Sequence, residues 1–352
     1  MGVSSALGSS ALLPAGLGFR NKIINGDFRI NQRGFSSTTT NGTYGLDRWY
    51  FQTSTGTGTY SRQTFTTGSP VAPGLDSEAF ARVVSASQTG SSALLIFSQK
   101  IEDVRNCAGS TVSISLYAKA ASGNPKVAVE LEQQFGSGGS PSANVTNYVG
   151  QVTLTTSWQL YTLTFNVPSI SGKTIGTTAN TSSLVLNLWC SAGTDYNART
   201  GSLGVQNNTF DFWGVQVEQN YRPTPFEQRP IGVELALCQR YYEKSYDTDT
   251  APNSNTNNGL VYFSGSTDNN GQIFYPVIFK VPKRSTNYQI AFNINTGASA
   301  GNWQYNRSGA SANTAMTNYL PGNNGFIALS GNIGVGWVAA NLVGHWACNA
   351  EL

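Results

Sequence analysis

The chain has 352 residues, a length that suits two domains of ordinary size. Only 11% of its residues are charged, and the formal net charge of +3 is thinly spread, so no basic stripe of the kind that binds nucleic acid is present. Abundant Gly, Ser, Thr and Asn, with 11% aromatic residues, are typical of an all-β protein with many turns and exclude a disordered chain.

Residues 1–20 are small and mildly apolar, without a clear period. They lack the basic opening of a secretory signal, and no run of about 18 apolar residues occurs in the chain, so membrane insertion is not expected. We predict that residues 1–20 form an extended N-terminal arm that anchors the protein to a larger assembly. A disordered leader is the alternative interpretation.

Residues 21–229 show the period of two that is typical of strands with one buried face. Short apolar and β-branched segments alternate with Gly, Ser, Asn and Pro clusters, and no helix-length periodic segment separates them. The segments with this pattern are 79–85, 94–101, 111–118, 126–133, 158–167, 183–190 and 209–218. The spacing predicts an N-terminal jelly-roll β-sandwich over residues 21–229.

A short linking helix is predicted within residues 230–246. The segment 232–244 places Leu235, Cys238, Tyr241 and Tyr242 on one side of a helix, and Pro230 precedes it, where a missing N–H costs little. Such a helix could line the axis of a trimer, or it could act as a spacer between domains.

Residues 247–352 predict a smaller C-terminal β-sandwich, with strands near 259–264, 271–281, 288–293, 325–330, 335–340 and 342–352. Trp303, Tyr305 and Tyr319 stand among Gly, Asn and Ser residues, which is the composition of adaptable recognition loops. We therefore predict that Trp303, Tyr305 and Tyr319 bind a ligand. The alternative is that these rings fill a small core, an interpretation favoured for Trp337.

No cofactor or metal site is predicted. The four cysteines are far apart and the chain has one histidine, His345, so zinc-site spacing is absent and buried thiols are favoured over a disulfide. Carbohydrate-binding jelly rolls often hold a structural calcium ion, for which Asp27 and Asp211 are the candidates by position. Calcium needs six to eight oxygen ligands, and few carboxylates lie nearby in the sequence.

No catalytic residues are predicted, and we expect a protein that is not an enzyme. Nucleophile elbows, phosphate-binding loops and metalloprotease motifs do not occur in the sequence. Glu130 and Glu132 lie two residues apart on one strand, where paired carboxylates could support glycoside hydrolysis. Two exposed glutamates on a solvated face explain the same pattern without chemistry.

A polar and aromatic cluster at Asp47, Arg48 and Trp49 permits two interpretations. The ring could stack on a sugar while the charged groups bind hydroxyls. Alternatively, Asp47 and Arg48 form a buried pair that closes a turn, with Trp49 in the core, and this structural interpretation is favoured. The same preference applies to the polar residues of the segment 25–32.

Several uncommon motifs occur in order along residues 21–246: NKIINGDFRINQRG at 21–34, LDRW at 46–49, FSQKIEDV at 97–104, SLYAKA at 115–120, DFWGVQVEQ at 211–219 and TPFEQRPIGVELALCQRYYEKSY at 224–246. This string resembles a carbohydrate-binding-module-like jelly-roll domain that is common in bacteriophage tail-fibre and other virion structural proteins. The resemblance covers about two thirds of the chain. The C-terminal segment is similar, more weakly, to the distal domain that often follows.

The resemblance implies a bacteriophage virion protein, a tail-fibre or receptor-binding subunit that is homotrimeric. Its arm at residues 1–20 would join other phage structural proteins, and its C-terminal domain would contact a glycan or receptor on the host surface. A capsid decoration or head-fibre protein is the alternative. A polysaccharide-degrading tailspike is a third, although the long β-helix repeats expected for one are absent from the sequence.

Overall fold

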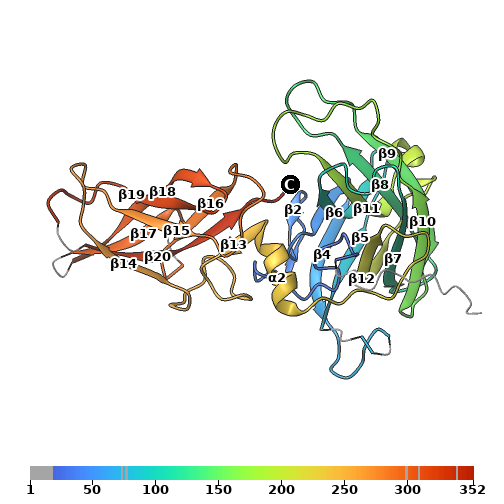
Figure 1. Ribbon diagram of the computed structural model, residues 1–352. Coiled ribbons are helices and arrows are strands. Elements are labelled where there is room, and N and C mark those ends of the chain that lie inside the picture. The colour runs from blue at the N-terminus through green and yellow to red at the C-terminus, as the bar shows by residue number, and fades with distance from the viewer. Residues whose placement is uncertain (1–18, 73, 76–77, 298–299, 308–309, 338–339) are drawn as a thin grey trace, which may run out of the picture.

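The computed structural model describes residues 19–352, except 73, 76, 77, 298, 299, 308, 309, 338 and 339. The arm predicted for residues 1–20 therefore lies almost wholly outside the described residues. The predicted fold class is confirmed, because the chain is all-β, with an N-terminal sandwich, a short helix α2 and a smaller C-terminal body (Figure 1). The division of the chain at residues 229 and 246 stays a prediction.

The N-terminal sandwich consists of two six-stranded antiparallel sheets. The first sheet has the order β1 (Ser37–Thr38), β4 (Thr57–Thr64), β5 (Ala79–Ala86), β12 (Asn208–Glu218), β7 (Thr111–Ala120) and β10 (Gln159–Asn166). The second has the order β2 (Thr43–Tyr44), β3 (Tyr50–Ser54), β6 (Leu94–Glu102), β11 (Ser183–Ala192), β8 (Lys126–Gln134) and β9 (Val145–Thr153). The crossings between the sheets are those of a jelly roll.

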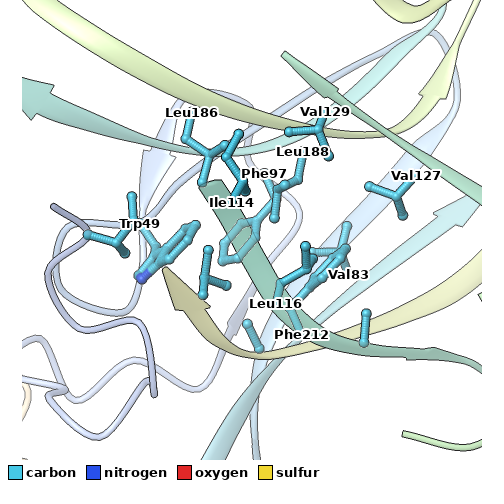
Figure 2. Close-up of a cluster of buried hydrophobic side chains, with 14 of the residues drawn as sticks. Trp49, Val83, Phe97, Ile114, Leu116, Val127, Val129, Leu186, Leu188 and Phe212 are labelled. Carbon is cyan, nitrogen blue, oxygen red and sulfur yellow. The ribbon is translucent and has the colours of Figure 1, made fainter. Parts of the chain in front are cut away.

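The core of the sandwich is built from the inward residues of both sheets. Phe97, Leu186 and Leu188 from the second sheet meet Ile114 and Phe212 from the first, as Figure 2 shows, and all five are fully buried. Each buried side chain of this size contributes about 1.5–3 kcal/mol relative to exposure. The period of two seen in the sequence is the period of burial in strands such as β5, whereas β11 and most of β12 are buried on both faces.

Two short helices follow β11: η1 (Thr194–Tyr196) and α1 (Asn197–Thr200). Gly201 ends α1 with φ of 60°, and a Cβ there would lie 2.4 Å from the Tyr148 ring, so both backbone conformation and space require glycine. Within the described ranges, no helix has the length and hydropathy needed to cross a membrane.

Helix α2 (Ile231–Gln239) is shorter than the helix predicted for 232–244. After it the chain becomes extended and forms β13 (Tyr242–Lys244), which pairs with the last strand, β20 (Ala340–Asn349). Strand pairing and burial of Tyr242 outweigh the local helical pattern. The helix therefore ends at Gln239 and does not continue to 244. Leu235, which the sequence placed on its buried side, is partly exposed.

Strands of the C-terminal body form one hydrogen-bonded network. These are β13 and β20 with β14 (Val261–Gly265), β15 (Phe274–Ile278), β16 (Gln289–Asn293), β17 (Asn302–Arg307), β18 (Ala310–Gly322) and β19 (Gly325–Ser330). The long strands β18 and β20 change partners along their length, so the sheet closes around a core of aromatic rings. The strand predicted for 335–340 is wrong over 335–337, which are not in a strand.

Buried charges join the two bodies at a seam beside α2, where the C-terminus also lies (Figure 1). The guanidinium of Arg48, which is 1% exposed, forms an ion pair with Glu351. Its carbon lies 3.4 Å from the centre of the Tyr241 ring, and its Nη2 donates to the Lys100 carbonyl at 2.5 Å. Removing a partner from such a buried charge is costly, so the seam resists separation.

Candidate functional site

The outward face of the second sheet is the candidate site, and its residues follow from strand alternation. In β6, Leu95 and Phe97 point into the core, so Ile96, Ser98 and Lys100 point outward. The register places outward residues of neighbouring strands side by side across the sheet. A polar surface thus lies directly behind the hydrophobic core.

Two rows of paired residues form the floor of this face. Ser98 lies between Tyr50 of β3 and Asn187 of β11, and in the next row Ile96 lies opposite Trp189. The face is hollowed into a groove of about 300 Å³, which we call the sheet groove. Its lining consists of Tyr50, Gln52, Leu94, Ile96, Ser98, Lys100, Glu132, Gln134, Val185, Asn187, Trp189, Tyr196 and Arg199.

A buried carboxylate organises one end of the groove. Glu130 is 0% exposed and accepts two hydrogen bonds from Arg199, at 2.7 and 2.9 Å. Its Oε2 also accepts from Trp189 Nε1 and from Asn187 Nδ2, both at 2.9 Å. Bidentate pairing fixes the guanidinium in one orientation, so Arg199 is held ready beside the groove. Arg199 also reaches Glu132 at 3.3 Å.

Helices η1 and α1 bring Tyr196 and Arg199 over the sheet. The Tyr196 ring lies 5.1 Å from the Trp189 ring, and the Arg199 guanidinium lies 5.1 Å above the same indole. Burial acts to lower the pKa of Arg199, but its hydrogen bonds and the charges of Glu130 and Glu132 outweigh burial and raise the pKa. Arg199 is therefore a permanent cation at this end of the groove.

Lys100 and Gln52 supply the polar groups nearer the seam. Both side chains are partly exposed, and within the described part of the chain Lys100 has no ion pair. Burial lowers the pKa of the Lys100 ammonium, while the Glu132 carboxylate acts to raise it. Amide, hydroxyl and ammonium groups beside the apolar side chains of Ile96 and Trp189 are suited to a polyhydroxylated ligand, which needs donors and acceptors together.

Neither interpretation of Glu130 and Glu132 from the sequence fits the structure fully. Glu130 is buried and engaged by three donor side chains, so it is not a solvated surface residue and has no open oxygen for proton transfer to a substrate. Glu132 accepts from Asn144 as well as Arg199. The arrangement is a satisfied polar network that holds the side chains at this end of the groove in fixed positions.

The structure places the three predicted ligand-binding residues apart from the groove. Trp303 lies on β17 and is 0% exposed, with its Nε1 donating to the His345 carbonyl at 2.7 Å, so its ring cannot stack on a ligand. Trp303 is core, and its prediction as a ligand contact is corrected. Tyr305 is partly buried against the same core, whereas Tyr319 on β18 is 44% exposed.

The cluster Asp47, Arg48 and Trp49 is structural, as favoured, but not in the expected pairing. Trp49 is buried and stacks on Phe97 at 4.5 Å. Asp47 accepts from the backbone and side-chain amides of Gln32, at 2.7 and 2.8 Å, instead of pairing with Arg48. Arg48 turns toward the C-terminal body and forms part of the seam, whereas Trp49 belongs to the core of the sandwich.

The calcium candidates are both paired with arginines. Asp211 accepts from Arg82 at 2.7 and 2.9 Å, and Asp27 pairs with Arg29. Among the described residues no cluster of three or more His, Cys, Asp or Glu side chains could hold a metal ion. The prediction of buried thiols is confirmed, because all four cysteines are reduced and buried.

Sequence reasoning missed the groove, although a signal for it existed. In the motif FSQKIEDV, Phe97, Gln99 and Ile101 point inward and are buried, whereas Ser98 and Lys100 lie on the other side of the strand and line the groove. That signal marks a polar face on one strand. It does not say which strands lie beside it, and Arg199 comes from a helix that the sequence pattern did not predict.

The comparisons with known proteins place one recognised family within the sandwich. Residues 77–187 match the family model described as carbohydrate binding domain, and this span includes β6, β8 and the first half of β11. No curated protein matches the chain. Among solved structures, the tailspike protein 4 enzymatically active domain of bacteriophage CBA120 is 12% identical, with a TM-score of 0.30, and the match covers 57% of this chain and 22% of that one.

Two further solved structures are carbohydrate-binding modules. A xylan-binding domain from Paenibacillus barcinonensis is 16% identical, with a TM-score of 0.32, and the match covers 52% of this chain and 98% of that one. A family 11 module from Clostridium thermocellum, in complex with a β-1,3-1,4-mixed-linked tetrasaccharide, is 9% identical with a TM-score of 0.30, covering 54% and 99%. By its match to the carbohydrate binding domain family over residues 77–187, the N-terminal sandwich is similar to a carbohydrate-binding-module jelly roll.

Proposed function

We propose that this chain binds a glycan in the sheet groove and performs no chemistry on it. The observation that carries the proposal is the set of fixed polar side chains on the open face of β3, β6, β11 and β8, within a segment that matches the carbohydrate binding domain family. Sugars offer many hydroxyl groups, and Gln52, Lys100 and Arg199 present complementary donors and acceptors beside the apolar side chains of Ile96 and Val185.

We further propose that the glycan belongs to a bacterial host surface and that the protein is a tail-fibre or receptor-binding subunit of a bacteriophage, assembled as a homotrimer. The resemblance of the motif string over residues 21–246 supports this part of the proposal. Attachment to a host requires that the protein binds the glycan without cleaving it. The carboxylates of Glu130 and Glu132 already accept hydrogen bonds from neighbouring side chains, which accords with binding without cleavage.

Glycan binding is tested on an oligosaccharide array that includes bacterial surface polysaccharides, followed by calorimetry with the best ligand. Lys100→Ala removes a groove donor, and we expect affinity to fall about tenfold, as for loss of a charged hydrogen bond. Lys126→Ala, at the exposed start of β8 outside the groove lining, is the control and should bind normally. Equal affinities for both variants would contradict the groove as the site.

Two further assays test the remaining parts. Release of reducing sugar from a bound polysaccharide would overturn the non-enzymatic assignment. Antibody labelling of intact phage particles should place the protein on the tail, and labelling confined to the capsid surface would reject the tail-fibre role while leaving glycan binding intact.

A further inference from the structure

An exposed apolar face covers three neighbouring strands of the C-terminal body, β15, β19 and β18. Alternate residues of these strands, such as Val277 and Phe326, point into the core, and the residues between them point outward. We call the outward set the apolar face. It consists of Phe274, Pro276 and Ile278 from β15, Ile327 and Leu329 from β19, and Thr317 and Tyr319 from β18. Leu320 follows Tyr319 at a β-bulge that breaks the alternation, and its side chain is exposed as well.

The register makes these side chains contiguous. Ile327 lies between Pro276 and Tyr319 across the three strands, and the Phe274 and Tyr319 rings meet edge to face at 6.2 Å. Ile278 is 80% exposed and Leu320 63% exposed. The exposed apolar area is on the order of 400 Å², comparable to the largest apolar patch of a typical monomeric protein, and such patches are often functional.

The face has no charge. Strands β15, β18 and β19 contain no Asp, Glu, Lys or Arg, and the first charged residue after β15 is Lys280. Exposed Ser311, Asn313 and Asn323 provide an uncharged polar rim. An apolar centre with a polar rim is the anatomy of a protein interface.

The absence of charge restricts the partner. A charged surface docked here would lose its hydration and gain no ion pair, which costs several kcal/mol. The partner surface must therefore be apolar and uncharged, and a second copy of the apolar face meets both conditions. Ile278 and Leu320 are aliphatic and offer no donor or acceptor to sugar hydroxyls, which argues against a glycan as the occupant.

The edge of the sheet is a poor alternative contact. Strand β15 ends the path of paired strands, but Pro276 occupies its middle and has no N–H to donate. Extension of the sheet into another chain is therefore disfavoured. Natural proteins commonly protect their edge strands against such pairing. Contact through the face does not need these backbone groups.

We propose that the copies of the homotrimer proposed above, on which this inference rests, associate through the apolar face, with Ile278 and Tyr319 near the symmetry axis. Residues at the axis of a closed assembly meet their own counterparts, which suits side chains that carry no charge. The groove lies on the N-terminal sandwich and this face on the C-terminal body, so self-association and glycan binding are independent and fail independently.

Sedimentation velocity and light scattering of the full chain test the proposal. At roughly 50 µM, which populates interfaces with low-micromolar Kd, the wild-type mass should be a multiple of 37.5 kDa. The double variant Ile278→Lys/Tyr319→Lys should return to one copy. Tyr262→Lys, on β14 and 63% exposed outside the face, is the matched control and should keep the wild-type mass.

The variants must be folded for the result to count, so thermal unfolding accompanies each mass measurement. Leu320→Lys is a second variant at a 63% exposed position and should also dissociate the assembly. A wild-type protein that stays at one copy would overturn the proposal, as would a folded double variant that keeps the wild-type mass. Glycan affinity per chain should stay unchanged in all three variants.

Discussion

The sheet groove and the apolar face are both outward faces of antiparallel sheets, yet they suit different partners. The groove gathers amides and charges, and Glu130 fixes Arg199 with two hydrogen bonds. The apolar face has no charged residue and exposes aliphatic and aromatic groups. The inward residues of both sheets fill a core. The residues that alternate with them and point outward therefore decide what each face can bind.

The largest effect expected is that of Trp303→Ala, which tests whether the C-terminal rings are core or ligand contacts. Removing the buried indole should lower the free energy of unfolding by about 3–5 kcal/mol and leave glycan affinity unchanged. Urea unfolding and calorimetry measure the two quantities. Tyr319→Ala, at a 44% exposed position, should cost less than about 1 kcal/mol. A stable Trp303→Ala protein without glycan affinity would restore the ring as a ligand contact.

Arg199→Ala comes next and tests whether charges in the groove are structural as well as binding groups. Loss of the guanidinium leaves the buried Glu130 carboxylate uncompensated, which should cost roughly 3 kcal/mol of stability and also weaken glycan binding. Arg105→Ala breaks an ion pair with Asp103 that is exposed on both sides and should cost less than about 1 kcal/mol. Equal losses of stability would show that Glu130 does not depend on its partner.

A smaller effect is expected from pH, and it should act on the C-terminal body. His345 is 0% exposed, with Nδ1 3.1 Å from Ser245 Oγ and Nε2 3.0 Å from the Thr256 carbonyl oxygen. Burial lowers its pKa below the ordinary 6.5, so below pH 6.5 the unfolded chain binds more protons than the folded chain. Stability should fall as pH falls from 6.5, by at most about 1.4 kcal/mol per unit.

Urea unfolding at pH 7.5, 6.5 and 5.5 measures this loss. His345→Gln should be less stable at pH 7.5, because the ring stacks on Tyr246 at 3.9 Å, but its stability should vary less between pH 6.5 and 5.5. An unchanged pH dependence in the variant would assign the loss to other groups. Glycan affinity should not follow this titration, because His345 lies outside the groove.

The smallest effect should come from Gln52→Ala, which removes one neutral amide from the groove. We expect glycan affinity to fall about threefold, the value of a single neutral hydrogen bond, with no change in stability. Gln159→Ala, exposed on β10 in the other sheet, is the matched control and should bind like wild type. If both variants bind alike, Gln52 does not contact the ligand.

Much of the N-terminal fold could be predicted because its strands have one buried face. The segment 79–85 became β5 (Ala79–Ala86), since its alternation agrees with the burial that the sheet imposes. Strands β17 and β18 were missed because they are rich in Asn, Ser, Thr and Ala and look like loops. Their pairing with β20 and β19, which the local sequence does not encode, makes them strands.

The candidate site could not be predicted for a related reason. The groove needs Tyr50, Ser98 and Asn187 in one row, which depends on the register of three strands far apart in sequence. Trp303 was assigned to a loop by its Gly and Asn neighbours, although its strand points the ring inward. Composition marks aromatic residues as important, but only the register says which face of the sheet they occupy.

The seam also has a consequence for the order of folding during synthesis. Arg48 pairs with Glu351, 303 residues further along the chain, and it has no other ion pair among the described residues. A nascent chain that has completed every strand of the N-terminal sandwich therefore still lacks the carboxylate that neutralises this arginine. Closure over that guanidinium must wait until Glu351 has been synthesised, so docking of the two bodies follows folding of the N-terminal sandwich.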